Sequence, residues 1–173
     1  MYTVTRDVDA SPERVWAVLE DGWTYPSWVV GASRMRAVDE RFPAPGSKLY
    51  HSVGVWPAVV SDETLVLDSE APRRLRLQAR GWPAGEATVE LRIEPSERGS
   101  RLTILEDVTR GPSLFLPASI RQPAIALRNT ETLRRLAYMA ERRTSPDSVD
   151  GPDAGSAASL HKSKVHVDPD ASL

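Results

Sequence analysis

The sequence predicts an α+β fold: a curved, seven-stranded antiparallel sheet wrapped around a long C-terminal helix, with two short helices between strands 1 and 2. Three observations favour this fold. Apolar and polar side chains alternate through much of residues 32–109, which is the period of half-buried strands. Turns that contain Pro or Gly separate these stretches, and short connections between strands favour antiparallel pairing. A final amphipathic segment is suited to cover the apolar side of the sheet.

The N-terminal elements are expected to be one strand and two short helices. Residues 2–8 alternate in the manner of a strand. A helix should follow, because Ser11 is a favourable N-cap, Pro12 suits the first helical position and Gly22 ends the apolar pattern. The aromatic-rich residues 23–28 then predict a second short helix or turn.

Six further strands are expected after these helices. Their ranges are 32–39, 47–55, 59–68, 73–80, 84–94 and 100–109. The joints between them read FPAPG, WP, APR, GWPAG and SERG, which is typical turn chemistry. In the clearest alternation, Leu75 and Leu77 lie on one face while Arg74 and Arg76 lie on the other. The sheet should therefore have one buried and one solvated side.

Residues 116–143 predict the long helix. Ile125, Leu133 and Leu136 share one helical face, whereas Arg128 is expected to point elsewhere. Pro123 leaves two possibilities open: a helix over the whole segment, or a regular helix that begins only at Pro123 after a separate turn or kinked entry at 114–122.

Residues 1–143 are expected to form one domain and residues 144–173 a disordered C-terminal tail. The tail has no aromatic residue and almost no large aliphatic one, so it cannot bury enough surface to offset the entropy lost on ordering. A length of 173 residues with 40% apolar composition suits one domain with a substantial core.

Composition and missing motifs exclude several classes of function. A formal net charge of −2 gives no basic field for nucleic acid. The chain has no cysteine and no apolar run of about 20 residues, so we expect a cytoplasmic protein without stable membrane insertion. Nucleotide-binding glycine motifs and nucleophile or zinc motifs are missing, and His51 is the single histidine before residue 144. We therefore expect no metal and no cofactor.

Three polar residues fall on faces that are otherwise apolar. His51 follows Leu49 at a two-residue step, and Glu106 continues the alternation that contains Ile104. Asn129 lies on the apolar face of the long helix. Buried polar groups need partners, so these three side chains should bond each other, hold water or face the oxygen atoms of a ligand.

An apolar mouth is expected at one end of the sheet, because alternate hairpins of a meander lie at the same end. The joints at Trp56 and Trp82 should meet there with residues 111–117, which include Phe115. Large rings beside prolines favour contact with a ligand or a partner. The alternative is that both tryptophans only cap the core.

The sequence resembles the START-like, or SRPBCC, superfamily of helix-grip ligand-binding domains, and within it the bacterial polyketide cyclase/dehydratase and lipid-transport branch. The segments that carry this resemblance read ASPERVWAVL, YPSWV, TVELRIEPSERGSRLTILEDV and RNTETLRRLAYMAERR. The resemblance covers about residues 3–143. It implies a hydrophobic cavity under the long helix, with Trp28 the aromatic residue best placed to touch a ligand.

The leading hypothesis is a domain that sequesters or carries a small hydrophobic molecule such as a lipid, polyketide or isoprenoid. The candidate ligand-binding residues are Trp28, His51, Trp56, Trp82, Glu106, Phe115, Ile125, Asn129 and Leu133.

Two other functions stay open. One is a polyketide cyclase/dehydratase that uses His51 as general base and Glu106 as acid in an aldol-type cyclisation or dehydration. The other is a protein-interaction module that docks a partner at the end near Trp56 and Trp82. Neither the ligand nor the oligomeric state follows from the sequence.

Overall fold

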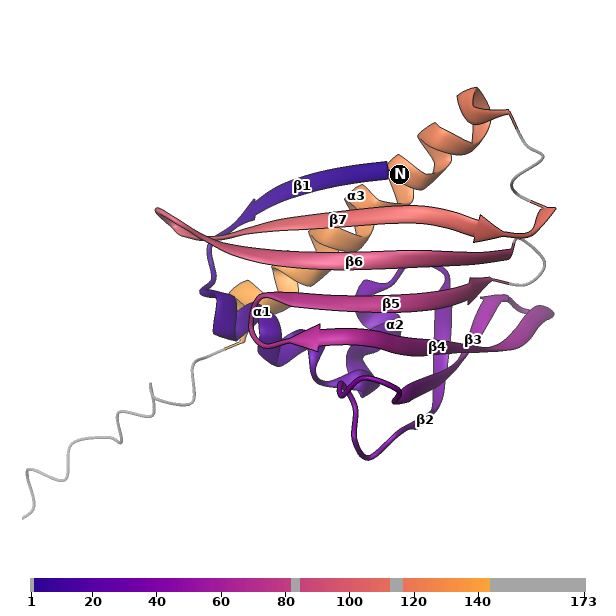
Figure 1. The fold of residues 1–173 in the computed structure, drawn as a ribbon, viewed down its shortest axis with the longest axis horizontal. Helices are drawn as coiled ribbons and strands as arrows, with labels where there is room; N and C mark the ends of the chain where they lie inside the picture. The colour runs from indigo at the N-terminus through magenta and orange to yellow at the C-terminus, as the bar shows by residue number, and fades with distance from the viewer. Residues whose placement is uncertain (1, 82–84, 113–116, 144–173) are drawn as a thin grey trace, which may run out of the picture.

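A seven-stranded antiparallel sheet with the strand order β1-β7-β6-β5-β4-β3-β2 forms one layer of the protein (Figure 1). The computed structural model describes residues 2–81, 85–112 and 117–143. The strands are β1 (Tyr2–Val8), β2 (Ala32–Val38), β3 (Lys48–Val55), β4 (Ala58–Glu70), β5 (Arg74–Gly81), β6 (Gly85–Ser96) and β7 (Gly99–Arg110). The helices are α1 (Pro12–Leu19), the single 3₁₀ turn η1 (Gly22–Thr24), α2 (Tyr25–Trp28) and α3 (Ala118–Arg142).

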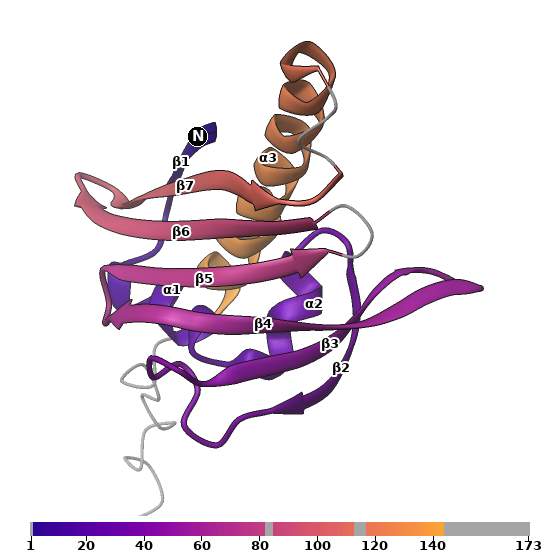
Figure 2. The ribbon, with the colours of Figure 1, turned by 45° about the vertical axis from the view of Figure 1, so that its right-hand side comes forward.

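This arrangement confirms the fold predicted from the sequence. Strands β2 to β7 are paired in chain order, and β1 closes the order by pairing with β7, in a register that places Val4 opposite Ile104. The segment that contains α1 and α2 carries the chain from β1 to the opposite edge of the sheet. The predicted strand ranges are right in position, although β4 and β6 extend further than expected. Figure 2 shows the β3–β4 hairpin projecting past the neighbouring strands.

The short N-terminal helices also agree with the prediction. The Ser11 side chain accepts a hydrogen bond from the Arg14 backbone N–H over 3.4 Å and caps α1. Gly22 begins η1 rather than ending α1. A Cβ at Gly22 would lie 2.7 Å from Leu49 Cδ2 and 2.8 Å from Val38 Cγ1, so a glycine allows this turn to approach the sheet closely.

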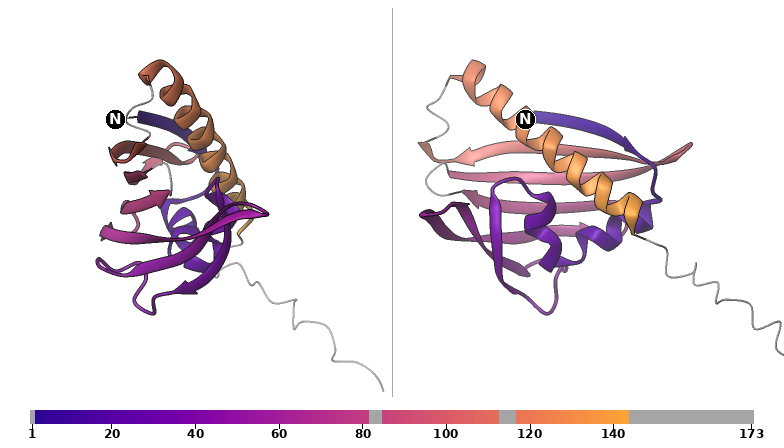
Figure 3. Two further views of the ribbon diagram at one scale, coloured as in Figure 1. Left: turned by 90° about the vertical axis from the view of Figure 1, so that its right-hand side faces the viewer. Right: turned by 180° about the vertical axis from the view of Figure 1, so that it is seen from behind.

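The apolar face of the sheet packs under the helices. Buried apolar side chains on this face come from strands including β3 to β7: Leu49, Val66, Leu75, Leu77, Leu91, Ile93, Leu102 and Ile104. Seen from behind the sheet, α3 crosses it diagonally, and α1 and α2 lie beside α3 (Figure 3). Most polar residues of these strands lie on the other face, which is the alternation that the sequence predicted, but Thr64 of β4 and Glu106 of β7 are buried polar residues.

Helix α3 is continuous from Ala118 and passes through Pro123. Residues 118–122 are helical, so they do not form the separate turn considered for residues 114–122; residues 113–116 lie outside the described residues. Proline lacks an N–H, so Pro123 leaves one hydrogen bond of the helix unmade. The helix tolerates this loss because it is long and Pro123 lies near its N-terminal end.

The two halves of α3 are buried to different extents. In the C-terminal half, Leu133, Leu136 and Ala140 are fully buried against the core. In the N-terminal half, Ile125 is only partly buried and Ala124 is exposed. The helix therefore packs tightly at one end and stands further from the sheet at the other. None of the helices in the described part of the chain is long and apolar enough to cross a membrane.

Replacing Leu133 by alanine is expected to lower the free energy of unfolding by about 2–5 kcal/mol, because the fully buried side chain would leave a cavity under α3. Leu127, which is 75% exposed on the same helix, gives the matched control, and its replacement by alanine should change stability by no more than about 0.5 kcal/mol. Urea denaturation of the two variants measures both values. Similar losses in both would contradict this assignment of the helix faces.

Candidate functional site

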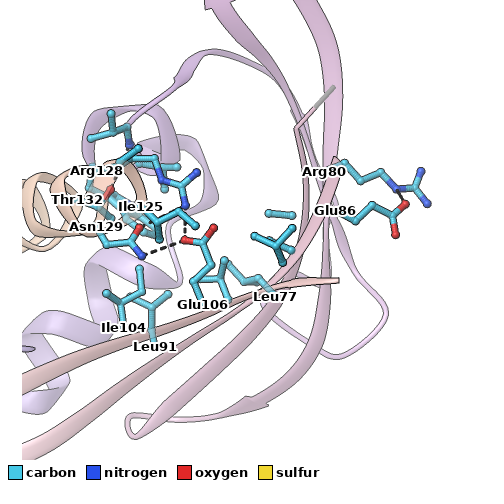
Figure 4. A pocket seen from close by; sticks show the side chains of 18 of the residues that line it. Leu77, Arg80, Glu86, Leu91, Ile104, Glu106, Ile125, Arg128, Asn129 and Thr132 are labelled. Carbon is cyan, nitrogen blue, oxygen red and sulfur yellow. Dashed lines mark hydrogen bonds and ion pairs between the residues drawn. The ribbon is translucent and has the colours of Figure 1, made fainter. Parts of the chain in front are cut away.

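A cavity of about 350 Å³ lies where α3 stands away from the sheet. Its walls come from α2 and the residues after it, from the inner faces of β5, β6 and β7, and from the N-terminal half of α3 (Figure 4). The apolar lining residues are Tyr25, Trp28, Val29, Val30, Leu77, Ala79, Ala87, Val89, Leu91, Ile104, Val108, Ala124 and Ile125. The remaining lining residues are Arg80, Gly85, Glu86, Glu106, Arg128, Asn129 and Thr132.

One wall of the cavity carries a cluster of three polar side chains, Glu106, Arg128 and Asn129. Glu106 projects from β7, and its carboxylate Oε2 accepts hydrogen bonds from Arg128 Nη2 and, over 2.9 Å, from Asn129 Nδ2. The side chain of Glu106 is 3% exposed and that of Arg128 is 43% exposed. Arg128 therefore reaches the buried carboxylate from the rim of the cavity, where its own charge stays partly hydrated.

The helix face that lines the cavity follows from helical spacing. Ile125, Arg128, Asn129 and Thr132 are separated by three, one and three residues, so they share one face of α3. Thr132 Oγ1 accepts a hydrogen bond from the Val30 N–H over 3.3 Å and links this face to the segment after α2. Helix α3 thus supplies the apolar side chain of Ile125, the positive charge of Arg128 that pairs with Glu106, and the side-chain amide of Asn129.

A second polar cluster, formed by Tyr25, His51 and Thr64, lies under α2 on β3 and β4. His51 Nε2 is 3.0 Å from Thr64 Oγ1, and the Tyr25 hydroxyl is 3.2 Å from the same oxygen. The rings of Tyr25 and His51 lie 5.1 Å apart between centroids. Tyr25 also lines the cavity, so this chain of polar groups ends at the cavity wall.

Burial determines how the second cluster titrates. Burial lowers the pKa of His51, and the nearby Asp62 opposes this shift only in part. The same cause raises the pKa of Tyr25 and the pKa of Asp62. His51 is therefore neutral at neutral pH. Within the described residues, His51 Nδ1 has no hydrogen-bond partner.

Trp28 is a cavity residue. Its ring is 3% exposed and meets Tyr25 edge-on, with 5.2 Å between the ring centroids. The indole Nε1 is buried without a hydrogen-bond partner in the described part of the chain. Burying an N–H without a hydrogen-bond partner costs free energy. Residues that serve only as packing therefore seldom have such an N–H.

The structure divides the site residues expected from the sequence into groups. Trp28, Glu106, Ile125 and Asn129 line the cavity. His51 and Leu133 are buried but do not line it. Trp56 is 85% exposed at the turn of the β3–β4 hairpin and does not line it either. Trp82 and Phe115 lie outside the described residues.

The physical reason for this division is the strand order. His51 and Glu106 both face inward, but β4, β5 and β6 separate their strands, which corresponds to about 19 Å along a flat sheet. The three polar residues expected in one space therefore form two clusters, with Asn129 beside Glu106. Leu133 sits one helical turn beyond Asn129, where α3 already touches the core. Trp56 projects with its hairpin into solvent.

Sequence reasoning missed Arg128, Tyr25 and Thr132. Arg128 was expected to point away from the apolar face, but its long side chain reaches back to Glu106. The signal available in the sequence was its position three residues after Ile125 and directly before Asn129. In residues 2–81, 85–112 and 117–143, no group of three or more His, Cys, Asp or Glu side chains is arranged to hold a metal ion.

Comparison with known proteins finds one family model, described as polyketide cyclase / dehydrase and lipid transport, which matches residues 2–141. No curated protein matches the sequence. A solved structure from Rhodobacter sphaeroides is 24% identical and aligns over 79% of this chain and 89% of its own, with a TM-score of 0.62. A protein from Chromobacterium violaceum is 18% identical over 82% of this chain and 97% of its own, with a TM-score of 0.61.

A third solved structure is the di-domain ARO/CYC StfQ from the steffimycin biosynthetic pathway. It is 12% identical and aligns over 81% of this chain but 50% of its own, with a TM-score of 0.64. At these identities the three structures are similar to this chain in fold.

Acidification should destabilise the protein partly through His51. Because burial lowers its pKa in the folded state, the unfolded chain binds the proton more tightly, and stability falls as the pH drops below the ordinary histidine value of about 6.5. Unfolding free energies are measured from about pH 7.5 to about pH 5.5. The free energy of unfolding of His51→Gln should fall less steeply than that of the parent protein, and the two slopes should differ by up to about 1.4 kcal/mol per pH unit. His161 and His166 are common to both proteins and cancel in the difference. Parallel pH profiles would disprove this role of His51.

Proposed function

The chain belongs to the polyketide cyclase/dehydrase and lipid-transport family, and from this premise we propose that it binds a small hydrophobic molecule in the cavity under α3. The bound molecule would be sequestered or transported. A lipid, a polyketide or an isoprenoid-like compound fits this description. The family match over residues 2–141 supports the class of ligand and leaves its identity open.

The observation that carries this proposal is the composition of the cavity wall. Its volume of about 350 Å³ lies within the range of small-molecule sites. Most of its lining is aliphatic or aromatic, and the polar groups are concentrated around Glu106. Such a wall favours a ligand with a large apolar body and a small polar part, because apolar surface gains free energy on leaving water.

A second candidate function is a polyketide cyclase/dehydratase reaction in the same cavity. The observation that favours it is the hydrogen-bonded chain from Tyr25 through Thr64 to His51, which connects the cavity wall to a neutral imidazole. A neutral histidine can accept a proton, and the Glu106 carboxyl group lines the same cavity as Tyr25. In this reaction His51 would act through Tyr25, since His51 itself does not line the cavity.

The catalytic alternative is tested with soluble poly-β-keto thioesters and mass spectrometry of the products. If the protein is an enzyme of this kind, cyclised isomers of unchanged mass, separated by chromatography, or dehydrated products lighter by one water should form, and His51→Gln and Glu106→Gln should lower the rate by about a hundredfold or more while retaining affinity. If no thioester is converted, while both variants bind a neutral hydrophobic dye like the parent, the protein is a binder and not this enzyme.

The binding proposal predicts that filling the cavity prevents ligand binding. Ile125→Trp places a larger ring in the cavity and should weaken binding of the neutral dye N-phenylnaphthylamine by at least about tenfold, as measured by the increase in its fluorescence. Leu127→Trp adds the same ring on the exposed face of α3 and should leave the affinity unchanged. If both variants bind the dye like the parent protein, this cavity is not the binding site.

A further inference from the structure

We infer that the cavity selects neutral ligands that carry a hydroxyl group and rejects carboxylates such as free fatty acids, and that Glu106 makes this selection with Arg128 and Asn129. This inference rests on the proposed binding function and specifies the chemistry of the ligand. It follows from the charges that face the cavity and from the hydrogen-bonding capacity that they leave unused.

The charges around the cavity are paired. Arg80 and Glu86 belong to its lining, but they pair with each other over 3.2 Å and point away from α3 (Figure 4). Arg80 also binds Glu63 over 3.0 Å. Of the charged side chains that line the cavity in the described part of the chain, Glu106 and Arg128 are then the two beside the ligand space, and they form an ion pair. The wall offers a ligand no net charge.

The carboxylate of Glu106 still offers one hydrogen-bond acceptor to a ligand. Both of its hydrogen bonds, from Arg128 and Asn129, end on Oε2. The bonds from Arg128 and Asn129 leave Oε1 as the oxygen that a ligand can reach, and Figure 4 shows the carboxyl group extending from β7 into the space before α3. A carboxylate oxygen can only accept, so a ligand atom placed here must be a donor.

Thr132 lies on the face of α3 that carries Arg128 and Asn129, and its hydroxyl group complements the Glu106 acceptor. Its Oγ1 accepts a hydrogen bond from the Val30 N–H, and a threonine hydroxyl also carries one hydrogen that it can donate. A ligand hydroxyl is both a donor and an acceptor and therefore suits a wall that offers one group of each kind. The apolar body of such a ligand would lie against side chains such as Leu77, Val89 and Ile104.

A carboxylate ligand meets two obstacles at this wall. Its charge would lie beside the Glu106 carboxylate, where low polarity strengthens repulsion. If it instead took Arg128 as its partner, Glu106, whose side chain is 3% exposed, would lose its counter-charge inside the protein. An ammonium ligand would gain Glu106 but lie beside the Arg128 guanidinium. A neutral hydroxyl group avoids all of these costs.

The test compares three probes that share one ring system: naphthol, naphthoate and methylnaphthalene with the substituent at the same position. Isothermal titration of the full-length protein at neutral pH should give naphthol an affinity at least about tenfold higher than either of the others. Equal affinities for naphthol and methylnaphthalene, or tighter binding of naphthoate, would overturn the inference while leaving the binding function intact. If none of the three probes and no neutral dye binds, both the inference and the proposed function fail.

Variants assign the selectivity to its residues. Glu106→Gln removes the negative charge and frees Arg128, so naphthoate should gain at least about tenfold and the preference for naphthol should disappear. Glu90→Gln is the matched control, because Glu90 alternates with the cavity residues Val89 and Leu91 and binds Arg92 on the outer face. This control should keep the preference of the parent. A Glu106→Gln protein that still rejects naphthoate would contradict the role of Glu106.

A second variant keeps the test valid if Glu106→Gln does not fold. Arg128 is 43% exposed at the rim, and Arg128→Gln leaves the charge of Glu106 without its partner. The preference of naphthol over naphthoate should then increase beyond that of the parent. A smaller preference in Arg128→Gln would show that the guanidinium recruits carboxylates, and the inference would be wrong.

Discussion

The rest of the structure depends on how α3 packs against the concave apolar face of the sheet. A one-sided sheet must cover that face, and here most of the cover is one helix that crosses it diagonally. Along its C-terminal half, fully buried residues such as Leu133 and Leu136 join the helix to the core. Along its N-terminal half the helix stands off, and the space left is the cavity. One half of a single helix therefore contributes to stability, and the other half borders the cavity.

The same helix makes a buried carboxylate tolerable. A charged group removed from water is costly unless it has a counter-charge and hydrogen bonds, and Glu106 receives both from adjacent residues of α3. Any movement of the N-terminal half of α3 would change the size of the cavity and the partners of Glu106 together. The polarity of the site and its volume are thus coupled through the position of one helix.

The sequence predicted the fold well because each element depends on local patterns. Alternation located the strands, and turn residues separated them. A cap at Ser11 began the first helix, as the structure confirms. The alternation of side chains along each strand also predicted that Glu106 and His51 face inward, and both residues are buried. These predictions need only the direction of a side chain relative to its own backbone.

The site was predicted less well, because it depends on distances between strands that are remote in the sequence. The direction of His51 was right, but three strands separate it from Glu106. Arg128 was missed because helical position alone does not show that a long side chain turns back to a buried carboxylate. The apolar mouth expected at Trp56 stays a prediction, because Trp82 and Phe115 lie outside the described residues; Trp56 itself is 85% exposed on a projecting hairpin.

The central claim is that the space between the sheet and α3 holds one small apolar molecule. Native mass spectrometry of the full-length protein in the presence of naphthol tests this claim most directly. The account predicts a complex with one ligand per chain, formed in a saturable manner and lost when the protein is denatured. An unchanged protein mass at every ligand concentration up to the solubility limit would contradict it.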